Sequence, residues 1–195
     1  MNNKIIIAID AMGGENAPFK NIKGVSLFLE KNKKKNDIFF NLFGNEDLIK
    51  KELVKYNISS KFYKIFPSST VVSDEETPLT AIKNSKDSSM WNSINSQIVS
   101  NSNITLSAGN TGVLFVVSRM LLKTIETVNK PALAGLWPNE KNMNVVLDLG
   151  ANVECDEKNL IDFSEMGAAL YKALFPEDSP KVALLNIGSE EIKGT

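Results

Sequence analysis

Short apolar runs alternate along the chain with longer stretches in which apolar residues recur every three or four positions. The runs predict strands at residues 5–9, 38–43, 62–66, 104–106, 133–136, 145–149 and 182–187. Several of these runs are apolar at every position, which is typical of strands covered on both faces. Strands that alternate with helical stretches favour a mostly parallel α/β sheet.

The periodic stretches between the runs predict helices. The first begins near Pro18, which is tolerated in a first helical turn because its missing N–H would have no partner there. Asn45 is the predicted cap of the second helix, whose first two residues are acidic. Further helices are expected within residues 77–100, 111–123 and 160–175. We therefore expect a doubly wound α/β/α sandwich that forms a single domain over residues 1–195.

Composition excludes several classes of protein. Apolar residues make up 43% of the chain and charged residues 23%, an ordinary globular mixture, and the net charge of −1 provides no basic field to attract nucleic acid. The longest apolar stretch, residues 113–122, is much shorter than the roughly 20 residues that span a membrane. No signal-peptide pattern opens the chain. With Cys155 as the only cysteine, a reducing cytoplasm is the expected location.

The chain contains no histidine. This excludes Ser-His-Asp and Cys-His catalysis and most metal-ligand sets within these residues, and we expect neither a metal nor a cofactor. Any chemistry must use carboxylates, lysine, amides, hydroxyls or the basicity of the substrate. A nucleophilic role for Cys155 is not expected, because no activating base is evident.

Glycine stands beside a short polar residue after four of the predicted strands. The four loops are DAMGGENAP at 10–18, SAGNTG at 107–112, DLGANVE at 148–154 and NIGSEEIKG at 186–194. Ligands of open α/β sheets bind at the carboxyl ends of the strands. Glycine lets the backbone approach a ligand, and a helix that starts after such a turn offers free N–H groups to an anion. One such turn is usually only a turn, but four at one edge predict a site for a small anion, above all phosphate.

The four loops, with SSM at 88–90 and PAL at 131–133, resemble in sequence and order the motifs of the bacterial phosphate acyltransferases of phospholipid synthesis, the PlsX family. The resemblance implies transfer of a fatty acyl group from acyl carrier protein to inorganic phosphate, giving acyl phosphate. It also implies a fold related to phosphotransacetylases and isocitrate dehydrogenases, a homodimer, and peripheral association with the cytoplasmic face of the membrane. Because family members are longer, the chain is expected to be their N-terminal part, incomplete at the C-terminus.

The resemblance and the loop chemistry together suggest site residues. Catalytic roles are predicted for Lys193, Asn110 and Asn186. Substrate- or phosphate-binding roles are predicted for Asp10, Gly13, Gly14, Gly109, Thr111, Gly112 and Asn152. Phosphate is already partly a dianion at neutral pH, so positioning and preorganised donors can carry the reaction without a strong base.

Three alternatives stay open at this point. Lys193 could be a solvated lysine in a helix capped by Ser189. The donor could be an acyl-CoA, which would make the enzyme a phosphotransacetylase. The chain could also be a non-catalytic fragment that retains only part of the site.

Overall fold

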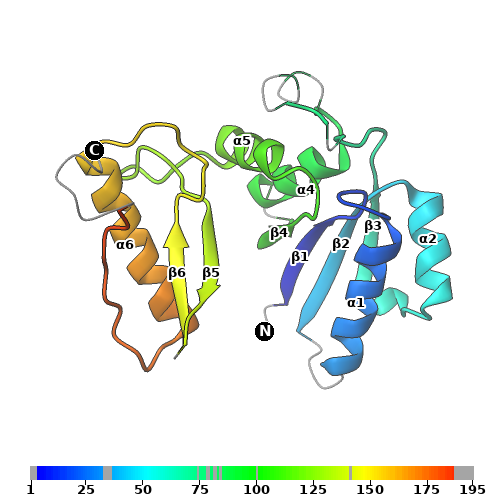
Figure 1. Ribbon diagram of the computed structural model, residues 1–195. Helices are drawn as coiled ribbons and strands as arrows, with labels where there is room; N and C mark the ends of the chain where they lie inside the picture. Colours follow the sequence, from blue (N-terminus) through cyan, green and yellow to red (C-terminus); the bar gives the residue numbers. More distant parts are fainter. Residues whose placement is uncertain are drawn as a thin grey trace. The chain divides into compact units, whose positions relative to one another are not determined.

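From β1 (Ile5–Asp10) to β5 (Ala134–Pro138), strands alternate with helices along the chain, and two successive strands then precede the last helix, α6 (Glu157–Leu174) (Figure 1). The computed structural model describes residues 4–32, 37–73, 75–77, 80, 83, 85–99, 101–140 and 142–186. Contacts divide the chain into two units, Met1–Lys123 and Thr124–Thr195. The expectation of a single domain over residues 1–195 stays a prediction.

The first unit is built on a four-stranded sheet in the order β3-β2-β1-β4. Its strands are β1, β2 (Ile38–Gly44), β3 (Tyr63–Pro67) and β4 (Ile104–Leu106), and all neighbouring pairs are parallel. The predicted strands 5–9, 38–43, 62–66 and 104–106 are therefore confirmed to within one residue at each end. Residue Ile9 pairs with Leu106, so β1 and β4 end side by side and their following loops leave the sheet together.

Helices cover both faces of this sheet. On one face, α1 (Phe19–Lys31) and α2 (Glu46–Lys55) pack against alternate strand residues, forming a core of Ile9, Ala11, Ile22, Val25, Phe40, Leu42, Ile49 and Leu53. On the other face, α4 (Ser89–Ile98) contacts β1, β2 and β4, and α5 (Thr111–Leu122) packs on α4. The doubly wound α/β prediction is confirmed for this unit.

A buried asparagine fixes the position of β4. Asn41 of β2 is 5% exposed and points to the α4 face, where its Nδ2 donates to the Asn101 carbonyl at 2.9 Å and to the Ser102 hydroxyl at 3.1 Å. An amide buried without partners would destabilise the fold, so these bonds fix the turn that leads from α4 into β4.

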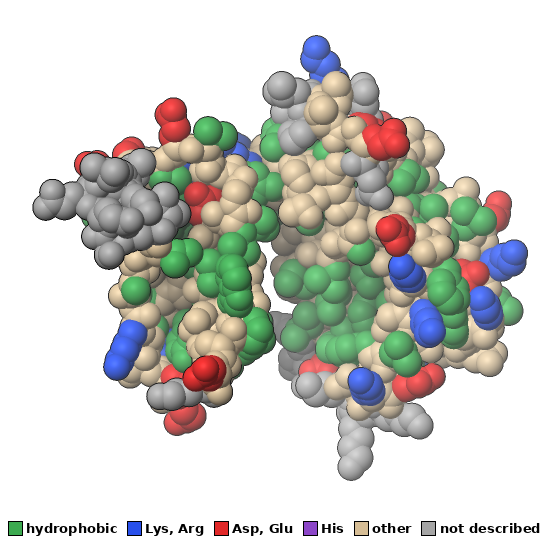
Figure 2. All heavy atoms as spheres, viewed as in Figure 1, with side chains coloured by type: hydrophobic (Ala, Val, Ile, Leu, Met, Phe, Trp, Pro, Cys, Tyr) green, Lys and Arg blue, Asp and Glu red, His purple; other side chains and the backbone are tan. Residues whose placement is uncertain are grey.

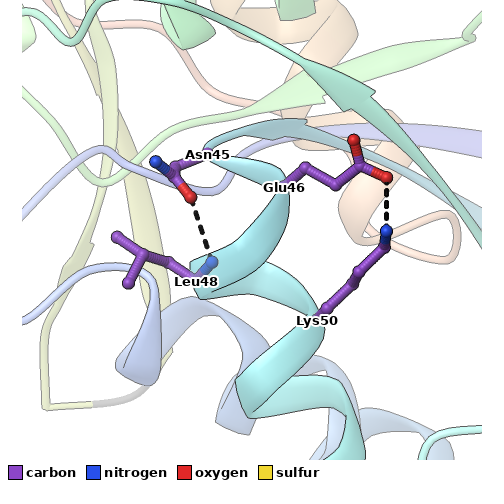
Figure 3. A network of polar contacts seen from close by, with 4 residues as sticks. All are labelled: Asn45, Glu46, Leu48 and Lys50. Atoms are coloured by element: carbon purple, nitrogen blue, oxygen red, sulfur yellow. Dashed lines mark hydrogen bonds and ion pairs between the residues drawn. The ribbon is translucent and has the colours of Figure 1, made fainter.

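Helix α2 (Glu46–Lys55) begins directly after the predicted cap residue, Asn45. Asn45 Oδ1 accepts the backbone N–H of Leu48 at 3.0 Å, and Glu46 pairs with Lys50 one turn later at 2.7 Å (Figure 3). The short helix η1 (Ser60–Phe62) then leads into β3. Of the helical region predicted over 77–100, α4 occupies Ser89–Ile98, while residues 78, 79, 81, 82, 84 and 100 lie outside the described residues.

The second unit differs from the prediction of a mostly parallel sheet. Its strands β5 (Ala134–Pro138) and β6 (Met143–Leu147) form an antiparallel hairpin, and α6 packs on β6. Helix α6 begins three residues before the predicted start, because Asp156 and Asn159 cap each other reciprocally.

The strand predicted at 182–187 is wrong for residues 182–186, which form no strand. Val182, Leu184 and Leu185 are 59%, 72% and 84% exposed. An apolar run is a strand only when a neighbouring strand pairs with its backbone, and hydrophobicity alone does not report that partner. Ile187 lies outside the described residues.

Charged and apolar side chains are unevenly distributed over the surface of the first unit. Lysines gather over α1 and α2, whereas apolar side chains are exposed near the sheet edge formed by β4, where Ile104 and Leu106 are each 49% exposed (Figure 2). Within the described part of the chain, no helix combines the length and apolar character needed to cross a membrane.

Candidate functional site

The loops that follow β1 and β4 are in direct contact. We call residues 10–18 the β1 loop and residues 107–112 the β4 loop. The Ser107 hydroxyl donates to Asp10 Oδ2 at 2.7 Å, and the backbone N–H of Gly109 donates to the Ser107 hydroxyl oxygen at 3.1 Å. The two glycine-containing segments that the sequence places at one sheet edge therefore form one connected structure.

The two glycines of the β1 loop make this contact possible. A Cβ atom on Gly13 would lie 2.4 Å from Asp10 Oδ2 and 2.9 Å from the backbone nitrogen of Gly109. Gly14 has a φ of +86°, and a Cβ atom there would lie 2.5 Å from the carbonyl oxygen of Ala108. Gly13 is needed because Asp10 and the β4 loop fill the space that a side chain would take, and Gly14 is needed because of its positive φ and the nearby Ala108 carbonyl. Their predicted ligand-binding role stays a prediction.

Asp10 is buried beneath this contact, at 1% exposure. One carboxylate oxygen accepts from Ser107, and the other accepts the Met12 N–H at 3.3 Å. Both oxygens are thus engaged inside the protein, and Asp10 orders the two loops. Whether it also forms a wall of a ligand site remains a prediction.

Asn21 of helix α1 holds the β1 loop, although it is not among the predicted site residues. Its Nδ2 lies 2.9 Å from the Ala11 carbonyl, 3.0 Å from the Gly13 carbonyl and 3.4 Å from the Asp10 carbonyl. A polar residue beside the buried Ile22 in the first turn of α1 was the available signal. Its partners could not be identified before the loop conformation was known.

Asn110 caps helix α5. Its Oδ1 accepts the N–H of Val113 at 3.1 Å, and its Nδ2 donates to the Glu76 carbonyl at 3.0 Å. The cap leaves the amides of Thr111 and Gly112 without an acceptor in the described part of the chain, and Thr111 is exposed. Two unpaired N–H groups at the positive end of a 12-residue helix form a favourable position for an anion.

A second polar cluster lies in the other unit, after β6. Asp148 has a φ of +58°, and its Oδ1 accepts both the backbone N–H of Asn152 at 3.1 Å and the side-chain Nδ2 of Asn152 at 2.9 Å. The same Nδ2 also donates to the Pro131 carbonyl at 3.0 Å. Asn152 is therefore held in one orientation by residues of its own unit.

Cys155 belongs to this second cluster. Its thiol donates to Asp148 Oδ2 at 3.4 Å. Burial first, and then the hydrogen bond to Asp148, raise the pKa of the Cys155 thiol above its ordinary value. The thiol form is favoured over the thiolate, which agrees with the expectation that Cys155 is not a nucleophile.

The predicted site residues thus fall into three groups. Those of the first unit meet in the contact between the loops and at the α5 N-terminus: Asp10, Gly13, Gly14, Gly109, Asn110, Thr111 and Gly112. Asn152 and Asn186 belong to the second unit. Lys193 lies outside the described residues. Among described side chains, no group of three or more His, Cys, Asp or Glu residues could hold a metal ion.

A family model described as "Fatty acid synthesis protein" matches residues 5–195. The chain belongs to this family. Within the fatty acid synthesis protein family, it is 50% identical over 194 residues to a phosphate acyltransferase of Pelagibacter ubique, a match that covers 100% of this chain and 57% of the relative. It is 38% identical to a phosphate acyltransferase of Anaplasma phagocytophilum, covering 100% of this chain and 56% of that relative. The chain thus spans little more than half the length of these curated relatives.

A solved structure also resembles this family member. The EutD phosphotransacetylase from Staphylococcus aureus superposes with a TM-score of 0.62 over 97% of this chain and 60% of that one, at 13% sequence identity. At this identity the likeness concerns the fold, and it confirms the expected relation to the phosphotransacetylase fold.

Proposed function

We propose that this protein is a phosphate acyltransferase that moves a fatty acyl group from acyl carrier protein to inorganic phosphate. The observation that carries the proposal is the start of α5, where the Thr111 and Gly112 amides have no acceptor among the described residues, in a chain whose relatives are named phosphate acyltransferases. Such an N-terminus suits a phosphate dianion.

The proposed reaction suits a chain without histidine. An oxygen of hydrogen phosphate attacks the thioester carbonyl carbon, and a tetrahedral oxyanion forms. The bond between carbon and sulfur then breaks, giving acyl phosphate and the thiolate of the carrier, which takes up the proton that phosphate loses. Binding the dianion in line with the carbonyl and stabilising the oxyanion are the main tasks of the protein.

In this proposal the N–H groups at the start of α5 hold phosphate or the oxyanion. Asn110 orders these groups through its cap, and its catalytic role, like that of Asn186, remains part of the proposal. Asn152 and Asn186 would orient acyl or phosphate oxygens, and Lys193 would supply positive charge. A lysine acts as a mobile point charge and so suits an oxyanion whose position shifts during the reaction.

The further properties implied by the family resemblance are proposals of the same kind. They are acyl carrier protein as the donor, a homodimer, a cytoplasmic location and peripheral association with the inner face of the membrane. We propose no nucleic-acid partner, and the net charge of −1 supports this view.

The alternative donor is an acyl-CoA, because the solved structure that the chain resembles is named a phosphotransacetylase. The two reactions share the attack of phosphate on a thioester and differ only in the carrier. A chain that binds phosphate without turning it over is the third possibility.

One assay distinguishes these functions. The purified chain is incubated with phosphate and either a long-chain acyl carrier protein or acetyl-CoA, and acyl phosphate is trapped with hydroxylamine. We expect product from the acyl carrier protein only; product from acetyl-CoA alone would favour a phosphotransacetylase. No product from either donor would favour the non-catalytic alternative.

In the same assay, Lys193→Ala should lower the rate about ten-fold or more, the scale of a lost oxyanion contact. The matched control is Lys158→Ala, which removes an exposed lysine from α6. Equal rates for the two variants would exclude Lys193 from the site.

A further inference from the structure

Ser107 lies between a buried carboxylate and the backbone of the β4 loop. Its hydroxyl donates to Asp10 Oδ2 at 2.7 Å, and its oxygen accepts the Gly109 N–H at 3.1 Å. A hydroxyl has a single hydrogen, and a carboxylate has none to donate. Asp10 therefore determines the direction of this hydroxyl, and only its oxygen lone pairs face Gly109.

This direction has a consequence for ligand binding. Neither the Ser107 hydroxyl hydrogen nor the Gly109 N–H is available to an anion, since both already have acceptors. The Thr111 and Gly112 amides, which have no acceptor among the described residues, are among the donors that remain at the loop. They directly follow the residues that Ser107 holds.

We propose that Ser107 is a positioning residue for the anion site: its hydroxyl, oriented by Asp10, fixes the β4 loop so that the Thr111 and Gly112 amides converge on phosphate. This inference rests on the proposed function for its ligand. It assigns to Ser107 and Asp10 an indirect role, in which neither touches the substrate.

The surroundings of Ser107 favour this role. A Cβ atom on Gly13 would lie 2.9 Å from the Ser107 hydroxyl oxygen, so the β1 loop closes the hydroxyl on that side. Asp10 is 1% exposed and is also held by the Met12 N–H. A hydrogen bond to a buried, ordered carboxylate is stronger than one between neutral groups, which suits a contact that must fix a loop.

The first test needs no substrate. Amide hydrogen exchange at Gly109 is compared in the wild-type chain, Ser107→Ala and Ser107→Thr, with Ser118→Ala in α5 as the control. We expect exchange at Gly109 to quicken about ten-fold in Ser107→Ala, the scale of one lost hydrogen bond, and to change little in Ser107→Thr, which keeps the hydroxyl. Unchanged exchange in Ser107→Ala would overturn the inference.

The second test measures phosphate affinity by calorimetry, with inorganic phosphate as the probe and the ¹H–¹⁵N shifts of the loop as a second readout. We expect phosphate to shift Thr111 and Gly112 and to bind about ten-fold more weakly to Ser107→Ala, with near wild-type affinity restored in Ser107→Thr. Equal affinities in the wild-type chain and Ser107→Ala would overturn the inference, because a merely structural serine would lower the thermal midpoint and leave affinity unchanged.

Asp10→Asn separates positioning from simple charge. If the carboxylate acted only by repelling the anion, removing its charge would tighten phosphate binding, and that result would overturn the positioning role. We expect weaker binding, since an amide can donate to the Ser107 oxygen and reverse the hydroxyl. If the wild-type chain bound no phosphate while Gly109 exchange still depended on Ser107, the proposed function would fail and the loop-fixing role would stand.

Discussion

Replacing Gly13 by alanine would place a methyl group inside the contact between the β1 and β4 loops. The added Cβ would lie 2.4 Å from Asp10 Oδ2, 2.9 Å from the Gly109 nitrogen and 2.9 Å from the Ser107 hydroxyl oxygen. These distances are shorter than ordinary van der Waals contacts. Two of the three atoms belong to a hydrogen-bonded pair of side chains and the third to backbone, so none can move aside freely.

The expected loss of stability follows from the contacts that the added methyl group would disturb. Overpacking a well-packed site destabilises by about 1–3 kcal/mol. Separating the loops would also weaken the hydrogen bond from Ser107 to Asp10, and bonds to charged groups contribute about 1.5–3 kcal/mol. Because the loops can separate part of the way, we expect Gly13→Ala to destabilise the first unit by about 3 kcal/mol.

Gly24→Ala is the matched control. Gly24 lies on the exposed side of α1, and a Cβ atom there would meet nothing within 4 Å. Alanine is favoured over glycine inside a helix by about 1 kcal/mol, so this substitution should stabilise the same unit. The same chemical change is thus expected to have opposite signs at two sites.

Urea unfolding followed by fluorescence measures both variants. Trp91 lies in the first unit and Trp137 in the second, and the chain has 2 tryptophans, so a Trp137→Phe background makes the signal specific for the first unit. A Gly13→Ala protein at least as stable as the wild type, beside a stabilised Gly24→Ala protein, would refute the close packing of the β1 and β4 loops.

Three further predictions concern residues that hold the β1 and β4 loops or that contact Asp148. Asn110→Ala should destabilise the first unit by about 1 kcal/mol in the same unfolding assay, because the Val113 N–H loses its acceptor; an unchanged midpoint would contradict the cap. Asn21→Ala should destabilise that unit by about 2 kcal/mol, and Asn21→Asp should not rescue it, since a carboxylate cannot donate to the loop carbonyls. Alkylation of Cys155 by iodoacetamide should reach half its limiting rate at a higher pH than for an ordinary thiol, because burial and Asp148 raise the Cys155 pKa. Asp148→Asn should move that half-point to lower pH, and an unmoved half-point would exclude the hydrogen bond as a cause.

The sequence alone predicted the secondary structure of the first unit wherever the signal came from neighbouring residues in the chain. Apolar runs located β1, β2, β3 and β4, and the cap at Asn45 was read from one residue and its acidic neighbours. It also placed the two glycine-containing loops at one sheet edge, since parallel strands present their carboxyl ends together. The family match over residues 5–195 agrees with the resemblance carried by those loops.

Only the tertiary structure decided which hydrogen-bonding groups are already paired with one another inside the protein. The sequence predicts that glycines, Asp10 and Asn110 serve a ligand. In three dimensions Gly13 and Gly14 make room for the other loop, Asp10 is engaged by Ser107, and the Asn110 side chain caps α5. Residue type states what a group can bind, but partners distant in sequence determine what remains for a ligand.

The same limit explains the error at residues 182–186. Hydrophobicity along a chain marks segments that gain by burial, and it determined the strands of this protein where a neighbour was present to pair with them. Whether a segment is a strand depends on backbone partners elsewhere in the fold, a long-range property that only the folded chain reveals.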